Sequence, residues 1–111
     1  MVKPLSPKQA AERIAQGGVD VIDVREPHEW VDGHVPGSRL VPLASFRQNP
    51  KATLVRDGVI FVCAAGMRSE TAARVAAQSG LKEVYNLTGG TRGWVKAGLA
   101  LEHEPAVTAA E

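Results

Sequence analysis

Apolar residues along the chain fall into short runs that alternate with amphipathic stretches, and this alternation predicts the secondary structure. Two runs rich in β-branched residues, 19–24 and 58–63, have the length of strands, and the second is apolar at nearly every position. A strand of that kind is typical of one covered on both faces. The sequence also predicts a strand at 83–87 and a short extended piece at 39–42.

Helices are predicted between these strands. Ser6 and Gln9 have the spacing of a capping box, so a helix should begin there and end at the glycines at 17–18. Further helices are expected over 69–79 and 91–97, with a single helical turn at 28–31. Strands that alternate with helices imply an α/β fold, in which a small, mostly parallel β-sheet is flanked by helices on both faces.

Length, charge and hydropathy limit the classes of protein to which the chain can belong. Its 111 residues suit one domain over 1–105, with a frayed C-terminal tail at 106–111. The net charge is +1 and there is no basic run, which argues against a nucleic-acid partner. Since no stretch approaches the roughly 18 apolar residues of a membrane span or contains a signal-peptide segment, we expect a cytoplasmic protein with no membrane partner.

Cys63 is the only cysteine, and its position favours chemistry over packing, the alternative for a cysteine that ends an apolar run. It lies at the carboxyl end of a predicted central strand, where the crevice of an open parallel sheet is found. The loop after it contains Gly66 and Arg68 and leads into a helix near Ser69. Loop N–H groups, the positive end of the helix dipole and the Arg68 charge would stabilise a thiolate, which is the nucleophilic form.

Four motifs, in family order across residues 2–105, resemble those of rhodanese-like sulfurtransferases. The loop at 63–69, C-A-A-G-M-R-S, resembles the family's C-x-x-G-x-R-S active-site loop. The other three are D-V-R-E-P-H-E-W at 23–30, G-H-V-P-G-S at 33–38 and G-G-T-R-G-W at 89–94. The resemblance implies a rhodanese fold in its single-domain form, with a parallel sheet of about five strands.

The resemblance also implies a reaction. Cys63 would take a sulfane sulfur from thiosulfate, a persulfide or a polysulfide, and pass it from a persulfide to cyanide or a thiol, a protein thiol included. No metal or organic cofactor is implied, and the expected state is a monomer or weak dimer. The implied substrate-binding loop consists of Ala64, Ala65, Gly66, Met67, Arg68 and Ser69.

Position 64 departs from the family pattern, because many thiosulfate-using members carry a second basic residue in this loop. Here residue 64 is alanine, and Arg68 is the only basic residue between 63 and 69. The loop therefore has less positive charge with which to attract a dianion such as thiosulfate.

The polar residues of the other motifs are expected to be mainly structural. Asp23 and Arg25 could approach the rim of the site, but we expect them to tie neighbouring backbone together. Glu26 and Glu29 should join that network or be solvated. His34 could pair with the cysteine as a base, but its place in a G-H-x-P-G loop favours a hydrogen-bonded structural role.

The remaining candidates are also interpreted structurally. Trp30 and Trp94 are expected to be core anchors, and Arg92 an exposed residue at a helix start. Because His28 and His103 lack the spacing of metal ligands, no metal site is expected.

Two other functions stay open at this stage. A phosphatase or arsenate reductase is one, but phosphatases related to this fold have five residues between cysteine and arginine, whereas here there are four, 64–67. The smaller ring of N–H groups suits one sulfur atom better than a tetrahedral phosphate. A binding or regulatory module is the other, although such modules commonly lack the cysteine that this chain retains.

Overall fold

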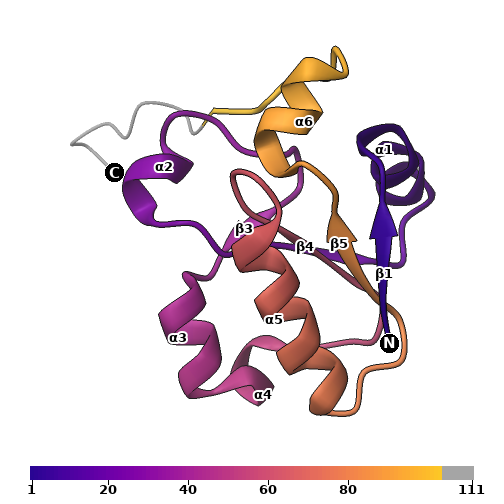
Figure 1. The fold of residues 1–111 in the computed structure, drawn as a ribbon, viewed down its shortest axis with the longest axis vertical. Coiled ribbons are helices and arrows are strands. Elements are labelled where there is room, and N and C mark those ends of the chain that lie inside the picture. Colours follow the sequence, from indigo (N-terminus) through magenta and orange to yellow (C-terminus); the bar gives the residue numbers. More distant parts are fainter. Residues whose placement is uncertain (104–111) are drawn as a thin grey trace, which may run out of the picture.

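The computed structural model describes residues 1–103, which fold around one parallel β-sheet. Its strands are β1 (Val2–Leu5), β2 (Asp20–Asp23), β3 (Arg39–Leu40), β4 (Val59–Val62) and β5 (Val84–Leu87). The order across the sheet is β1-β5-β4-β2-β3, so the strand that leads to Cys63 is central (Figure 1). The predicted α/β class and parallel sheet are confirmed.

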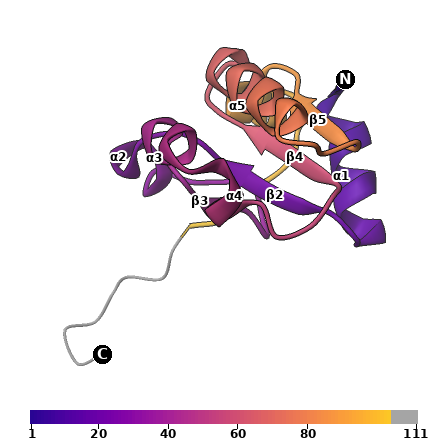
Figure 2. The same cartoon turned by 90° about the horizontal axis from the view of Figure 1, so that it is seen from below.

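The helices cover both faces of the sheet, as predicted. They are α1 (Pro7–Gln16), α2 (Pro27–Trp30), α3 (Leu43–Gln48), α4 (Pro50–Thr53), α5 (Met67–Gln78) and α6 (Gly90–Lys96). Figure 2 shows α5 on one side of the sheet and α1 on the other. None of the helices within residues 1–103 has the length and apolar character needed to cross a membrane.

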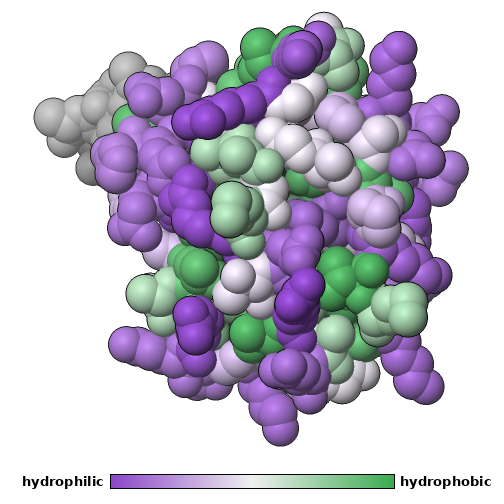
Figure 3. Space-filling model, in the orientation of Figure 1, coloured by the Kyte–Doolittle hydropathy of each residue, from purple (hydrophilic) through white to green (hydrophobic). Residues whose placement is uncertain are grey.

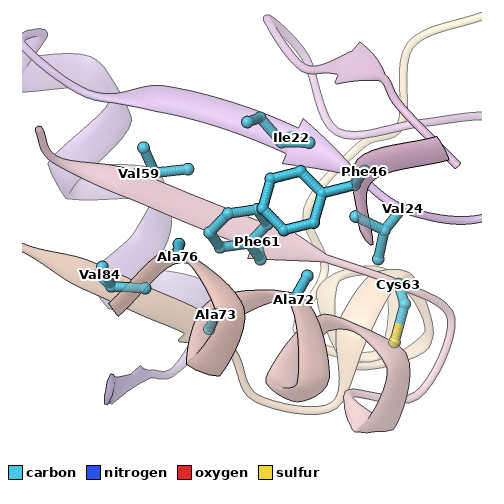
Figure 4. Packing of buried hydrophobic residues seen from close by; sticks show 10 residues of the cluster. All are labelled: Ile22, Val24, Phe46, Val59, Phe61, Cys63, Ala72, Ala73, Ala76 and Val84. Carbon is cyan, nitrogen blue, oxygen red and sulfur yellow. The ribbon is translucent and has the colours of Figure 1, made fainter. Parts of the chain in front are cut away.

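The apolar run in β4 is explained by burial on both faces of the sheet. Val59 and Phe61 pack with residues of α3 and α5, whereas Ile60 and Val62 pack with residues of α1 and α6. Figure 4 shows Phe61 against Phe46, with a ring centroid distance of 5.3 Å. In the same view the sulfur of Cys63 lies at the end of this cluster, beside the start of α5.

The helix start predicted at Ser6 is confirmed in atomic detail. The Ser6 hydroxyl oxygen accepts a hydrogen bond from the backbone N–H of Gln9 at 3.2 Å. The Gln9 side-chain oxygen accepts one in return from the backbone N–H of Ser6 at 2.9 Å. This reciprocal capping box satisfies two backbone N–H groups at the start of α1.

Three elements were not predicted from the sequence. β1 contains Lys3 and Pro4 and pairs only with β5, at the edge of the sheet, where a proline is tolerated. α3 and α4 are only six and four residues long, too short for a clear periodic pattern, and Phe46 is the buried residue of α3. The end of the proposed domain, 104–105, and the predicted tail at 106–111 lie outside the described residues.

Candidate active site

Cys63 follows β4 directly, and the start of α6 holds the backbone on which it stands. The carbonyl oxygen of Cys63 accepts a hydrogen bond from the N–H of Thr91 at 2.8 Å, and that of Ala64 accepts one from Arg92 at 3.1 Å. Gly90 has a φ of +61°, and a Cβ built there would lie 2.3 Å from the Cys63 carbonyl oxygen. The glycine at position 90 therefore allows a close approach of two backbones.

The Cys63 sulfur is buried, with 1% of the residue exposed, and is surrounded by hydrogen-bond donors. The N–H of Gly66 donates to Sγ at 3.0 Å, and the Ser69 hydroxyl lies 3.3 Å from it. Burial, the largest single influence, raises the pKa of the thiol. Hydrogen bonds from the Ser69 hydroxyl and from the N–H groups of Ser69, Gly66 and Ala65 together outweigh burial, so the pKa of Cys63 is lowered, the direction expected from the sequence.

Asn86 completes this arrangement and was not singled out in the sequence. Its Oδ1 atom lies 2.6 Å from the Ser69 hydroxyl oxygen, and its Nδ2 atom donates to the Gly66 carbonyl oxygen at 3.1 Å. One side chain of β5 thus holds two of the groups that contact the sulfur. The available signal was an amide in the otherwise apolar stretch V-Y-N-L, because a buried polar residue in a strand needs partners.

The hydrogen of the Ser69 hydroxyl cannot serve Asn86 and Cys63 at once. Because Nδ2 of Asn86 faces a carbonyl oxygen, its Oδ1 atom faces Ser69 and can only accept. The hydroxyl hydrogen therefore goes either to Oδ1 of Asn86 or to Sγ of Cys63. When the thiolate forms, the hydroxyl can turn to Sγ, since a charged acceptor makes the stronger hydrogen bond.

Arg68, whose charge was expected to help stabilise the thiolate, is paired with a carboxylate. Its two terminal nitrogens donate to the two carboxylate oxygens of Glu29 at 2.7 and 2.9 Å. The hydrogen bond from Arg68 is the main reason that the pKa of Glu29 falls to about 2, while the same contact raises the pKa of Arg68. The expectation that Glu29 joins the Asp23 network or is solvated was therefore wrong, because the Arg68 side chain at the start of α5 reaches Glu29 on α2.

Asp23 and Arg25 form a buried structural pair, in agreement with the prediction. Arg25 binds the Asp23 carboxylate, with the closest contact at 2.8 Å, and also donates to the Gly33 carbonyl oxygen at 2.8 Å. The pair therefore ties the end of β2 to the loop that follows α2.

His34 and the two tryptophans, which were expected to be structural, are buried to different extents. His34 is buried, stacks on Trp30 at a centroid distance of 3.6 Å and pairs its backbone with Glu102. Trp94 is buried in the cluster beneath α1 and α6 and donates to the Ala100 carbonyl oxygen at 2.8 Å. Trp30 is only partly buried, so its expected role as a core anchor is not confirmed.

The rim of the site carries exposed residues of mixed character. Met67 is 81% exposed and lines a surface hollow of about 250 Å³ with Gly66. Arg92 is exposed, as predicted, and lines a second hollow of about 410 Å³ with Val95 and Leu101. On the face seen in Figure 3, hydrophobic residues form separate patches among hydrophilic ones. Within residues 1–103, no cluster of His, Cys, Asp and Glu has the make-up of a metal site.

Comparison with known sequences gives one consistent family. The family model described as a rhodanese-like domain matches residues 6–97. Thiosulfate sulfurtransferase GlpE of Pseudoalteromonas translucida is 30% identical over 95 residues, covering 86% of this chain and 90% of that protein. The uncharacterized protein YqhL of Bacillus subtilis is 38% identical over 74 residues, or 67% of this chain. The putative sulfur carrier protein YrkF of the same organism is 34% identical over 76 residues, or 68% of this chain. The match covers only 59% of YqhL and 41% of YrkF.

Solved structures agree with the sequence comparison. A rhodanese-related protein of Thermoplasma volcanium has a TM-score of 0.81 and 31% identity, with 92% of this chain and 99% of that chain covered. A Rhodopseudomonas palustris protein described as a possible tyrosine phosphatase has a TM-score of 0.78 and 31% identity, with 91% and 85% covered. The family model that spans 6–97, together with these shared folds, shows that the chain belongs to the rhodanese-like domain family.

Proposed function

We propose that the protein is a sulfurtransferase that carries a sulfane sulfur as a persulfide on Cys63. The observation that carries the proposal is the set of donors around Sγ, in which the N–H of Gly66 lies at 3.0 Å and the Ser69 hydroxyl at 3.3 Å. These donors lower the pKa of the thiol despite its burial, and a thiolate is the form that attacks sulfur. The name of the GlpE relatives, thiosulfate sulfurtransferase, supports the same reaction.

In the first half-reaction the Cys63 thiolate attacks the terminal sulfur of the donor. A bond forms between Sγ and that sulfur, and the donor's own bond to the sulfur breaks. The leaving group departs with the electron pair, as sulfite from thiosulfate or as a thiolate from an organic persulfide. The negative charge moves to the terminal sulfur, where the N-terminus of α5 stabilises it.

In the second half-reaction an acceptor thiolate or cyanide attacks the terminal sulfur of the persulfide. The bond between Sγ and that sulfur breaks, and Cys63 leaves as the thiolate that began the cycle. Both steps are displacements at sulfur, so no external oxidant or reductant is needed.

The loop residues have distinct roles in this proposal. Ala65 and Gly66 supply backbone N–H groups to the sulfur, while Ser69 supplies a hydroxyl. Ala64 acts through its carbonyl oxygen, by which the loop is attached to α6. Met67, which is 81% exposed, lies at the mouth, where donor and acceptor arrive.

A sulfur carrier is the second candidate, because it would form the same persulfide without turning over. The name of YrkF, a putative sulfur carrier protein, favours it. A phosphatase has less support even though one structural relative is described as a possible tyrosine phosphatase. Arg68 is already paired with Glu29, and only four residues separate it from Cys63.

Intact-mass measurement after incubation with thiosulfate or polysulfide tests the proposal. We expect a gain of one sulfur atom, lost on addition of cyanide or a thiol, and no gain in Cys63→Ser, whose melting temperature should stay close to that of the wild type. Steady-state release of thiocyanate would separate an enzyme from a carrier. Absence of any sulfur adduct, or hydrolysis of an aryl phosphate that depends on Cys63, would contradict the proposal.

A further inference from the structure

We propose that Glu29 determines which sulfur donor the site accepts: by neutralising Arg68, it makes the pocket favour singly charged sulfane donors over the thiosulfate dianion. The inference rests on the proposed sulfurtransferase function and adds to it a specificity-determining residue outside the active-site loop. Glu29 belongs to α2, 39 residues before its partner in the chain.

The geometry of the pair indicates that the two charges are held together. Each of the two terminal nitrogens of Arg68 donates to a different carboxylate oxygen of Glu29, at 2.7 and 2.9 Å. This is the bidentate arrangement of a strong ion pair. The Glu29 side chain is only 23% exposed, and that of Arg68 37%. The N–H of Glu26 also donates to Glu29, at 2.9 Å, so the carboxylate is fixed on α2.

The other charges that face the loop do not replace the neutralised cation. At the end of β2, Arg25 is buried against Asp23 and forms a second neutral pair. On α6, Arg92 is an exposed cation at the rim, where solvent and salt screen its charge. The loop contributes N–H dipoles at Cys63 but no other charged side chain.

Donor charge then affects the reaction directly. Thiosulfate and the Cys63 thiolate together bring three negative charges into a pocket whose fixed charges cancel. Methanethiosulfonate, CH₃SO₂S⁻, brings one charge fewer while presenting the same kind of sulfur–sulfur bond. Attack by Sγ on its terminal sulfur yields the Cys63 persulfide and methanesulfinate, which departs with the electron pair. This donor is therefore a matched probe of charge.

Three variants separate the charge of Glu29 from its shape and from net charge. Glu29→Gln removes the charge and keeps the size, whereas Glu29→Asp keeps the charge. Glu70→Gln is the control, because Glu70 is also paired with an arginine, Arg74 at 2.7 Å, on the exposed side of α5. Both positions are at least partly exposed, so the fold should be retained in all three variants, which thermal unfolding will check.

The first measurement is kcat/KM for thiosulfate divided by kcat/KM for methanethiosulfonate. We expect Glu29→Gln to raise this ratio by about tenfold, or ~1.4 kcal/mol. Glu29→Asp and Glu70→Gln should leave the ratio within about twofold of the wild type, since neither frees the Arg68 charge. A ratio that does not move in Glu29→Gln, or that moves equally in Glu70→Gln, would overturn the proposal.

A second measurement does not depend on sulfur transfer. Iodoacetate is anionic and iodoacetamide neutral, and both alkylate Cys63, the only cysteine. Glu29→Gln should increase the rate with iodoacetate relative to iodoacetamide and shift the pH midpoint of alkylation downward. If the wild type accepts sulfur but neither readout responds, Glu29 has no such role. If the wild type accepts no sulfur from either donor, the proposed function and donor preference both fail, whatever the alkylation rates show.

Discussion

At the scale of the single residue, burial and hydrogen bonding act in opposite directions on the Cys63 thiol. Burial raises its pKa, and the donors around Sγ lower it by more. The same residue is therefore part of the hydrophobic cluster beneath α5 and a candidate nucleophile. The two interpretations offered by the sequence, packing and chemistry, both describe features of this one side chain.

The lowered pKa of Cys63 predicts how its reactivity varies with pH. The thiolate should still dominate somewhat below the ordinary thiol value of about 8.5 and be lost only as the pH falls through the lowered pKa. Sulfur uptake should follow the same curve. Alkylation rates with iodoacetamide across pH measure it, and a rate that keeps rising until about pH 8.5 would contradict the prediction.

Ser69→Ala should raise the pKa of Cys63. The substitution removes a donor that lies 3.3 Å from Sγ and leaves the Oδ1 atom of buried Asn86 without its hydroxyl partner. We expect the alkylation midpoint to move up by about one pH unit, equivalent to ~1.4 kcal/mol. Ser79→Ala is the matched control, because the Ser79 hydroxyl donates to the Val75 carbonyl oxygen at the other end of α5. An equal midpoint in both variants would mean that Ser69 does not act on the sulfur.

At the scale of the secondary-structure element, the start of α6 supports the active-site loop. The N–H groups of Thr91 and Arg92 bind the carbonyl oxygens of the first two loop residues. This contact requires the two backbones to touch, and only a residue without a Cβ fits at Gly90. The position of α6 therefore affects the direction in which the loop N–H groups point.

Gly90→Ala should disrupt both stability and the site. The new Cβ would lie 2.3 Å from the Cys63 carbonyl oxygen. The alanine would also have to keep a left-handed backbone conformation, with φ at +61°. We expect the free energy of unfolding to fall by about 2–4 kcal/mol and the alkylation of Cys63 to become slower. Gly98→Ala is the control, because its φ is +87° but a Cβ there meets nothing within 4 Å, so its cost should be about 1 kcal/mol. Chemical denaturation measures the free energy of unfolding of both variants. Similar losses would contradict the idea that contact with the Cys63 backbone excludes a Cβ at position 90.

At the scale of the whole molecule, buried and exposed ion pairs contribute differently to the free energy of unfolding. The Asp23 side chain is fully buried and depends on Arg25, which also binds the Gly33 carbonyl oxygen. The pair joins the sheet to the loop after α2, the same region that presents Glu29. Loss of Arg25 would leave the Asp23 charge inside the protein without this partner.

Arg25→Met should therefore cost about 3–5 kcal/mol in the free energy of unfolding. Arg74→Met is the control, because its pair with Glu70 lies on the surface and should contribute little. Urea denaturation measures the difference. If the two variants were equally stable, the Asp23 charge would have to be stabilised by other groups, such as the Arg25 backbone N–H that donates to it at 2.9 Å.

The local sequence determined the elements whose signal is contained in their own residues. The apolar strand at 59–62, the capping box at Ser6 and the helix after Cys63 were predictable, because burial on both faces, end capping and periodicity each leave a local pattern. β1 and α3 were not, since an edge strand with a proline and a six-residue helix carry little pattern of their own. The Cys63 loop was identifiable because its glycine, arginine and serine lie close together in the chain.

Only the tertiary structure decided which polar groups face that loop. Glu29 precedes Arg68 by 39 residues, and Asn86 follows Ser69 by 17, so neither contact follows from spacing. Both contacts exist because parallel strands place the carboxyl ends of β2, β4 and β5 at one edge of the sheet, where their following segments meet. The identity of the nucleophile is local information, whereas the charge and the hydrogen-bond partners around it depend on the fold, because electrostatic and hydrogen-bond contacts are set by distance in space.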